Sequence, residues 1–196
     1  MYEIASGLRR NEEFAFVSER LRFSVLKKGA YKEVTDYLVR NRDFHRQFSQ
    51  THSDSYFQEA TQKKYVDYDL KAFHKGDVFP FWITYRDNPN KILGRVSFFN
   101  TAYAGMMNCA CGYHLDKDEI GKGIMTEALK VCCEFMVKEL HMHRIEAFIL
   151  PKNEKSLSVV KRVGFEYEGR RVSYMHINGK YRDHEAFYIL EDKFSM

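Results

Sequence analysis

The sequence Gly121-Lys122-Gly123 lies between a short strand-like run and a long segment in which apolar residues recur at helical spacing. The first turn of a helix carries unpaired backbone N–H groups and the positive end of the helix dipole, and glycines let a phosphate approach the backbone closely. Two known phosphate motifs do not fit, because the dinucleotide fingerprint needs a glycine where Thr126 stands and no P-loop string occurs. The residues alone leave two interpretations open: an anion site, or glycines that let a strand and a helix pack.

A second candidate site follows Pro151, where Asn153 and Ser156 begin another helical pattern. Asparagine is a strong helix N-cap, and a polar residue three positions later fits the first helical turn. Capping alone would explain both residues, and a helix start that binds a ligand would explain them too. His141 and His143 lie close together in the sequence, but no third ligand accompanies them, so we expect no metal site.

The elements that must position these residues alternate between strands and helices. Period-two patterns predict strands at 20–25, 78–85, 92–101, 109–115, 144–150, 165–177 and 180–190. Helical spacing predicts helices at 30–41, 55–75, 124–140 and 153–163. Asn178 and Gly179 tolerate the positive φ of a type I′ turn, which predicts a hairpin between the last two strands. We therefore expect a single α/β (α+β) domain over residues 1–196, with helices against the faces of a mixed sheet.

Composition and charge exclude several classes of protein. The chain has 196 residues, of which 44% are hydrophobic and 30% are charged, so it is neither disordered nor collagen-like. A net charge of +4 is small for a dedicated nucleic-acid binder, and no apolar run reaches the roughly 20 residues of a membrane span. The first residues lack a secretion signal, and the four cysteines lack zinc-site spacing, so we expect a cytoplasmic protein with reduced thiols.

Four segments, in this order and spacing, resemble one enzyme family. They are GYHLDKDEIGKGIMTEALK at 112–130, HRIEAFILPKNEKS at 143–156, RVGFEYEG at 162–169 and NGKYRDH at 178–184. Over residues 20–190 the chain resembles the GNAT superfamily of N-acetyltransferases, and within it the ribosomal-protein-alanine N-acetyltransferases of the RimJ/RimL type. The resemblance implies the GNAT fold, a mixed central β-sheet splayed at a bulged strand and flanked by helices. It also implies acetyl-coenzyme A as co-substrate.

The same resemblance implies where the cofactor binds. In that fold two neighbouring parallel strands separate at a bulge, and the pantetheine arm lies between them. Here the strands would be 109–115 and 144–150, with the bulge at Gly112, because a glycine tolerates irregular backbone within a strand. The cofactor-binding residues would be Tyr113, His114 and Leu115 through their backbone, Ile120, Gly121, Lys122, Gly123, Ile124 and Met125 at the pyrophosphate, and Asn153 and Ser156 at the pantetheine and the sulfur.

There are three candidate catalytic residues, of which one follows from the resemblance and two from their expected positions at the gap. Many members use a tyrosine four residues before a Gly-Phe pair as general acid, but Val160 stands there, so Ser156 is the candidate acid in its place. The backbone N–H near Tyr113 would stabilise the oxyanion. Glu146, on the strand beside the gap, is the candidate base, although an ordinary ion pair with an arginine such as Arg144 would explain it equally well.

One departure from the family pattern concerns charge at the proposed anion site. Asp118 stands three residues before the first glycine, where the superfamily usually has Gln or Arg, and Asp116 and Glu119 add negative charge. Lys122 would offset part of that charge. We therefore expect a weaker grip on coenzyme A rather than a different identity.

The acceptor is predicted to be an amine that attacks the thioester directly in a ternary complex. An α-amino group with a pKa near 8 is about one-tenth neutral at pH 7, whereas a lysine is neutral about once in several thousand, so an N-terminal amine needs little help from a base. The leading prediction is therefore transfer to the N-terminal α-amino group of a protein, with a ribosomal protein as the family's usual acceptor. Aromatic residues that would line the acceptor groove, or belong to the core, are Tyr31, Tyr37, Phe44 and Phe48.

Two alternatives stay open at this point. A small amine, such as a polyamine or an aminoglycoside, would favour an acidic cleft beside Tyr113. A coenzyme A-binding module that docks on the ribosome without turnover is kept open by Val160 and Asp118. A homodimer is suggested by the family likeness alone, and we expect neither a membrane nor a direct nucleic-acid partner.

Overall fold

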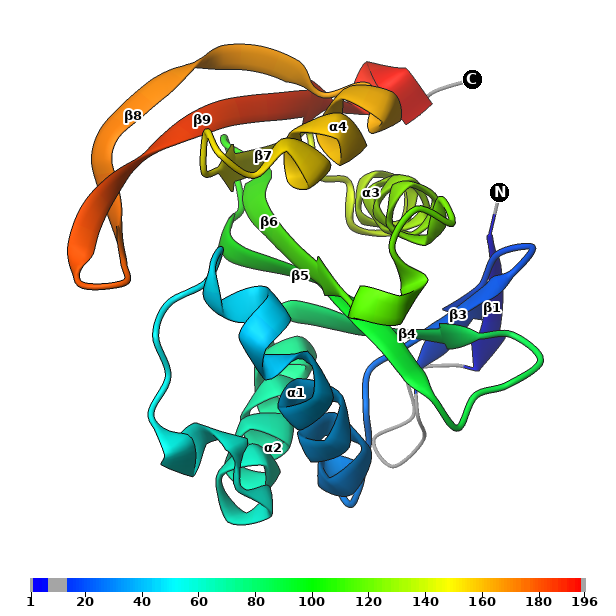
Figure 1. Cartoon of the computed structure of the whole chain (residues 1–196). Coiled ribbons are helices and arrows are strands. Elements are labelled where there is room, and N and C mark those ends of the chain that lie inside the picture. The colour runs from blue at the N-terminus through cyan, green and yellow to red at the C-terminus, as the bar shows by residue number, and fades with distance from the viewer. Residues whose placement is uncertain (1, 7–13, 195–196) are drawn as a thin grey trace.

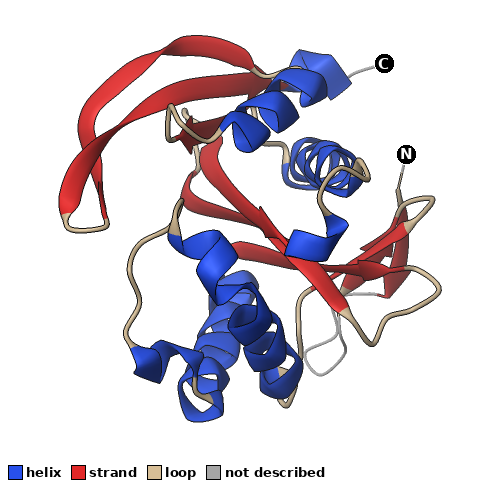
Figure 2. Ribbon diagram, viewed as in Figure 1, coloured by secondary structure: helices blue, strands red, loops and turns tan. Residues whose placement is uncertain are grey.

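The computed structural model describes residues 2–6 and 14–194, and in this part of the chain nine strands form one mixed sheet (Figures 1 and 2). The strands are β1 (Glu3–Ser6), β2 (Ala15–Val17), β3 (Leu21–Ser24), β4 (Phe79–Tyr85), β5 (Ile92–Ala102), β6 (Asn108–Leu115), β7 (Arg144–Ile149), β8 (Glu166–Ile177) and β9 (Lys180–Leu190). Their order across the sheet is β1-β2-β3-β4-β5-β6-β7-β9-β8. β6 and β7 pair in parallel, and the other neighbouring strands are antiparallel.

Two helices cover each face of this sheet. The α-helices are α1 (Tyr31–Arg46), α2 (Glu59–Lys75), α3 (Ile124–Leu140) and α4 (Glu154–Val163), and the short 3₁₀ turns are η1 (Asp54–Phe57), η2 (Lys117–Glu119) and η3 (Glu191–Phe194). Figure 1 shows α1 beside α2 on one side of the sheet and α3 beside α4 on the other. A parallel strand pair needs a long crossover, and α3 supplies it between β6 and β7.

The alternation of side chains along the strands builds a separate hydrophobic cluster on each face. On the α3 side, Phe16 stacks on Phe135 with ring centroids 4.6 Å apart, and Phe81 meets both rings edge-on. Trp82, the next residue of β4, points to the other face and packs with Tyr37 of α1. The α3 cluster is the larger one and forms most of the core.

The predicted mixed sheet with flanking helices is confirmed, and the differences lie near the N-terminus. The strand predicted at 20–25 is β3, the third strand, because β1 and β2 precede it. Strands of four and three residues are too short for a period-two pattern to stand out. The first helix runs on to Arg46, five residues beyond the predicted end at residue 41.

The last two strands form the predicted hairpin, which extends away from the helices (Figure 1). Its turn residues Asn178 and Gly179 have φ values of 50° and 78°, as a type I′ turn requires. The Asn178 side chain donates to the Arg46 carbonyl at 3.1 Å and accepts from the Thr51 hydroxyl at 2.7 Å. These two bonds join the hairpin tip to the last residue of α1 and to the segment that follows it.

Two expectations from composition can be compared with the described residues. All four cysteines are buried with free thiols, as expected for reduced cysteines in a core. Burial raises the pKa of the Cys109 thiol to about 12, so this thiol stays protonated and behaves as a small apolar group. Within 2–6 and 14–194, no helix has both the length and the apolar character that crossing a membrane requires.

Candidate functional site

The two parallel strands at the centre of the sheet separate part-way along their length. β6 pairs with β7 from Asn108 opposite Arg144 to Cys111 opposite Ala147. Beyond Cys111, β6 stays with β5 as far as Leu115, whereas β7 stays with β9. The edges of β6 and β7 that face each other beyond Cys111 are therefore open to a ligand with amide groups.

The bulge expected at Gly112 is a wrong prediction. Gly112 lies opposite Ser97 in a register with β5 that is continuous from Ala110 to Leu115. The irregular pairing lies further back, between Phe99 and Ala102 of β5. Beyond Cys111, β6 continues in register with β5 and β7 continues in register with β9, so the gap forms without an extra residue in β6.

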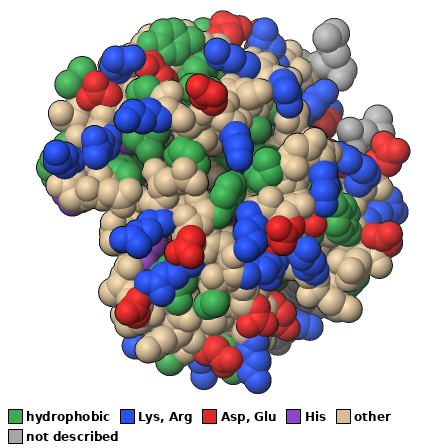
Figure 3. Space-filling view, in the orientation of Figure 1, with side chains coloured by type: hydrophobic (Ala, Val, Ile, Leu, Met, Phe, Trp, Pro, Cys, Tyr) green, Lys and Arg blue, Asp and Glu red, His purple; other side chains and the backbone are tan. Residues whose placement is uncertain are grey.

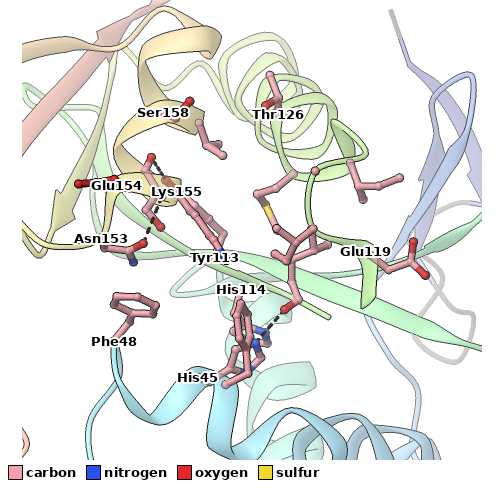
Figure 4. A pocket seen from close by; sticks show the side chains of 18 of the residues that line it. His45, Phe48, Tyr113, His114, Glu119, Thr126, Asn153, Glu154, Lys155 and Ser158 are labelled. Carbon is pink, nitrogen blue, oxygen red and sulfur yellow. Dashed lines mark hydrogen bonds between the residues drawn. The ribbon is translucent and has the colours of Figure 1, made fainter. Parts of the chain in front are cut away.

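A cavity of about 520 Å³ lies at this separation and extends through the sheet (Figure 4). Tyr113 and His114 are consecutive in β6 and point to opposite faces, towards α4 and α1 respectively, yet both line the cavity. A cavity of this volume is in the range of small-molecule sites. The lining includes every residue predicted to bind the cofactor except Lys122, namely Tyr113, His114, Leu115, Ile120, Gly121, Gly123, Ile124, Met125, Asn153 and Ser156.

The glycines of the loop before α3 are required by its backbone. Gly121 and Gly123 have φ values of 84° and 74°, in the left-handed region that disfavours residues with a Cβ. Gly123 is the N-cap of α3, so Ile124 and Met125 belong to the first turn, whose N–H groups have no partner within the helix. The loop thus places a helix N-terminus at the wall of the cavity.

The start of α4 is fixed by two hydrogen bonds. The Asn153 side chain accepts from the Ser156 N–H at 3.2 Å, which confirms the predicted N-cap. The Tyr113 hydroxyl donates to the Ser156 carbonyl at 3.0 Å, and burial raises the pKa of this phenol. Ser156 is therefore held at the cavity by an element on each side of it, and Lys155 and Arg162 bring positive charge to the same wall.

Lys122 does not line the cavity. Its ammonium lies 2.8 Å from the carboxylate of Glu119, which also accepts from the Tyr85 hydroxyl and is 3.3 Å from Lys91. Burial would raise the pKa of Glu119, but the hydrogen bonds from Lys122, Tyr85 and Lys91 hold it below its ordinary value. The acidic charge expected to oppose an anion is thus neutralised within the protein at Glu119, while Asp118 points to solvent.

Glu146, the candidate base, lies on β7 as predicted, but it does not lie with the other candidates. It pairs opposite Ala110, where β6 and β7 are still hydrogen-bonded to each other. Its carboxylate accepts from Arg144 at 2.9 Å and lies 3.9 Å from Arg171, in a separate surface cavity. The ion-pair interpretation that the sequence left open is the one the structure favours.

On the α1 face the cavity wall is made of aromatic and histidine side chains. Phe44 and Phe48, two of the four residues predicted for an acceptor groove, line the cavity. Tyr37 instead is fully buried and bonds to His114, and Tyr31 packs at the edge of the α1 cluster.

His45 was not singled out by the sequence, but it also lines the cavity. Its Nε2 atom lies 2.8 Å from the Leu115 carbonyl oxygen, 70 positions away in the chain. Burial lowers the pKa of His45, partly offset by the Leu115 carbonyl and by Asp116, and it lowers the pKa of His114 further. Both rings are therefore neutral at pH 7. Only the three-dimensional contact reveals this pair, because nothing local marks His45 or connects it with His114.

The family model described as an acetyltransferase (GNAT) domain matches residues 20–166. The chain belongs to the GNAT acetyltransferases. Its fold and enzyme class are those that the sequence resemblance predicted.

Named relatives and a solved structure narrow the comparison for this acetyltransferase. A probable N-acetyltransferase of Bacillus subtilis, YjcK, is 35% identical over 150 residues, which cover 76% of this chain and 82% of the relative. The [ribosomal protein uS5]-alanine N-acetyltransferase of Escherichia coli is 31% identical over 152 residues, or 77% of each chain. The crystal structure of the ribosomal-protein-S5-alanine acetyltransferase of Vibrio fischeri superposes with a TM-score of 0.85 at 29% identity, and the match covers 93% of this chain and 99% of that one.

Proposed function

We propose that this acetyltransferase transfers the acetyl group of acetyl-coenzyme A to the α-amino group of a protein N-terminus, with a ribosomal protein as the acceptor. The observation that supports this most directly is a single cavity, lined from both faces of the sheet, at the place where β6 and β7 separate. Two substrates can meet there from opposite sides of the sheet, as direct transfer in a ternary complex requires.

The donor side of the cavity suits coenzyme A in shape and charge. The open strand edges can complete their hydrogen bonds with the amide links of pantetheine, and the N-terminus of α3 suits a pyrophosphate. Lys155 and Arg162 add cations for its phosphates. When bound, acetyl-coenzyme A supplies an acyl group activated as a thioester. We assign protonation of the departing sulfur to the Ser156 hydroxyl and stabilisation of the oxyanion to the backbone N–H of Tyr113.

The acceptor side argues for a monocationic amine. Among the described residues that line the cavity, the carboxylates are Glu119 and Glu154, and Glu119 is already paired with lysines. Neither carboxylate belongs to α1, and Figure 3 shows cationic and anionic side chains interspersed over this side of the molecule. A polyamine favours an acidic cleft, so this lining supports a peptide α-amine instead. The two relatives named for a ribosomal-protein alanine support the same acceptor.

The experiment that tests this proposal measures thiol release from acetyl-coenzyme A with three acceptors. They are a peptide with the N-terminal sequence of a ribosomal protein that begins with alanine, the same peptide with a blocked N-terminus, and spermidine. The proposal predicts release with the free peptide and none above background with the blocked peptide. Mass spectrometry of the product should place one acetyl group on the α-nitrogen.

Other outcomes would assign the function differently. Release with spermidine alone would move the acceptor to small amines. Binding of coenzyme A without release from any of the three acceptors would contradict the proposal and favour a binding module without turnover. Turnover with any amine excludes that module.

A further inference from the structure

Two histidines face the same cavity from neighbouring elements, His45 near the end of α1 and His114 in β6. Their ring centroids are 5.3 Å apart, and each ring makes one hydrogen bond to a fixed partner. The chemistry of those partners determines which nitrogen of each ring carries the proton.

The partner of His114 is the Tyr37 hydroxyl, 2.7 Å from Nδ1. Tyr37 is fully buried, and among the described residues its hydroxyl bonds to this nitrogen alone, so the O–H must donate to it. Burial raises the pKa of Tyr37 well above its ordinary value, so the phenol keeps its proton. Nδ1 of His114 is therefore an acceptor, and the neutral ring carries its own proton on Nε2.

The partner of His45 is the Leu115 carbonyl, 2.8 Å from Nε2. A carbonyl oxygen can only accept, so Nε2 of His45 carries the proton and Nδ1 is left with a lone pair. Within the described ranges, no hydrogen bond reaches this Nδ1 atom. The backbone carbonyl thus holds the ring in the tautomer that a proton acceptor needs, which is the usual role of a residue that orients a general base.

The charges around His45 keep its ring neutral until a substrate arrives. On its own helix lie Tyr37, whose ring centroid is 5.9 Å away, and Arg40, which is paired with Asp116 at 2.6 Å. From the sheet, His114 adds a neutral ring 5.3 Å away, and Asp116, just after β6, adds a negative charge. Burial lowers the pKa of His45 more than Asp116 and the Leu115 carbonyl raise it. An acceptor ammonium is thus met by an uncharged ring rather than by a cation.

We propose that His45 is the general base of this enzyme and accepts a proton from the acceptor ammonium at Nδ1. The proposal deepens the proposed function and rests on it. His45 takes one proton from the R–NH₃⁺ group, leaves a neutral amine, and releases that proton to water. The amine nitrogen then bonds to the thioester carbonyl carbon, the carbon–sulfur bond breaks, and the leaving thiolate takes a proton from the Ser156 hydroxyl, which the second nitrogen proton restores. One proton is released per amide formed.

The test compares His45→Gln with the wild-type enzyme at saturating acetyl-coenzyme A and peptide. Glutamine can still donate to the Leu115 carbonyl but has no basic lone pair. We expect kcat to fall about 100-fold at pH 7, with the Kd for coenzyme A unchanged. The deficit should shrink as the pH rises from about 7 to 9, because more of the acceptor is then already neutral. In His45→Gly, added imidazole should restore part of kcat.

His52→Gln is the matched control. His52 lies in the segment after α1, stacks on Tyr56 at 3.8 Å, and is not among the residues that line the cavity. Its variant should keep wild-type turnover. A His45→Gln enzyme with kcat within about threefold of wild type, or a loss that is independent of pH and not rescued by imidazole, would overturn the assignment. If the wild-type enzyme binds coenzyme A but acetylates none of the three acceptors, that result contradicts the proposed function itself, and with it the assignment of His45 as the base.

Discussion

The two sides of the cavity differ in the groups they present to a ligand. On the α3 and α4 side, the groups offered to a ligand are mostly backbone: a turn at Gly121 and Gly123, two helix starts, and open strand edges. On the α1 side they are side chains, such as His45 and His114, each set by a contact with a distant segment. A backbone site keeps its chemistry when side chains change, so it suits a donor shared by many enzymes. A side-chain site can change its acceptor by a few substitutions.

The largest effect, on unfolding free energy, is expected where an ion pair joins α1 to the sheet. Arg40 of α1 donates to Asp116, which is fully buried, and to the Ile92 carbonyl. In Arg40→Ala the carboxylate would be left buried without its partner, which costs about 3 kcal/mol of unfolding free energy. Urea denaturation at pH 7 measures this change. Coenzyme A binding to the remaining folded protein should be preserved, because the donor side does not depend on this ion pair.

Arg42→Ala is the control for that prediction, because Arg42 lies on the same helix and its ion pair with Asp54 is exposed. An exposed pair contributes about 1 kcal/mol or less. Equal losses in the two variants would contradict the importance of the buried pair.

The same ion pair predicts how stability depends on pH. Burial would raise the pKa of Asp116, but the hydrogen bonds from Arg40, Asn41 and the Asp118 N–H hold it below its ordinary value. A carboxylate with a lowered folded-state pKa stabilises the protein fully above its unfolded pKa of about 3.9, and this contribution is lost as the pH falls through the folded value. In Arg40→Ala, burial without the Arg40 partner raises the pKa of Asp116 instead. Lowering the pH then protonates this carboxylate and removes the unpaired buried charge. The gap in unfolding free energy between the two proteins should therefore narrow as the pH falls from 7 towards 4, and a constant gap would argue against it.

On the donor side, Ser156→Ala tests the assignment of the leaving-group acid. We expect kcat to fall between about 10-fold and 100-fold, because proton transfer to the thiolate would then come from water. The Kd for coenzyme A should change little, since the N-cap bond uses the Ser156 N–H and not its hydroxyl. Ser158→Ala is matched to it, as Ser158 lines the same cavity from the same helix. Equal turnover in the two variants would remove Ser156 from the mechanism.

A change in the backbone of the loop before α3 should weaken the binding of coenzyme A without affecting the acceptor side. Gly123→Ala forces a Cβ onto a residue with a φ of 74°, which costs about 1–2 kcal/mol. This strain is relieved if the loop moves, so we expect coenzyme A to bind about tenfold more weakly, as calorimetry would show. Gly105→Ala is the control, because an added Cβ there meets nothing within 4 Å and its φ is not positive. An unchanged affinity for coenzyme A in Gly123→Ala would show that this loop does not contribute to coenzyme A binding.

The smallest effect is expected from Glu146→Gln. The carboxylate lies in a separate cavity and is paired with Arg144, so turnover should stay within about twofold of wild type. A loss of kcat as large as that of His45→Gln would reverse the comparison and restore Glu146 as the base.

The sequence predicted many of the residues that line the α3 and α4 side of the cavity, because their signals are local. A glycine turn before a helix and an Asn-x-x-Ser cap are each contained in a few consecutive residues, and the structure places Gly121, Gly123, Asn153 and Ser156 along one cavity. The acceptor side could not be predicted in this way. The bond between His45 and Leu115 joins residues 70 positions apart, so neither residue carries a sign of the other.

Strand register explains the remaining errors. Glu146 lies on the strand predicted to border the gap, but β6 and β7 are still paired at its position and part only beyond Cys111 and Ala147. The residue at which two strands part depends on a register between segments far apart in the chain, which no local pattern reveals. The bulge expected at Gly112 is absent, because β6 stays in continuous register with β5 where it separates from β7.

The position of the cavity between two faces of the sheet has a kinetic consequence. A nucleotide that occupies the side of α3 and a polypeptide that occupies the side of α1 do not obstruct each other's route in or out. Either substrate can then bind first, and the acetylated product can leave before coenzyme A does. Initial-rate patterns of a sequential, random-order mechanism follow from that arrangement, with each product competing against its own parent substrate.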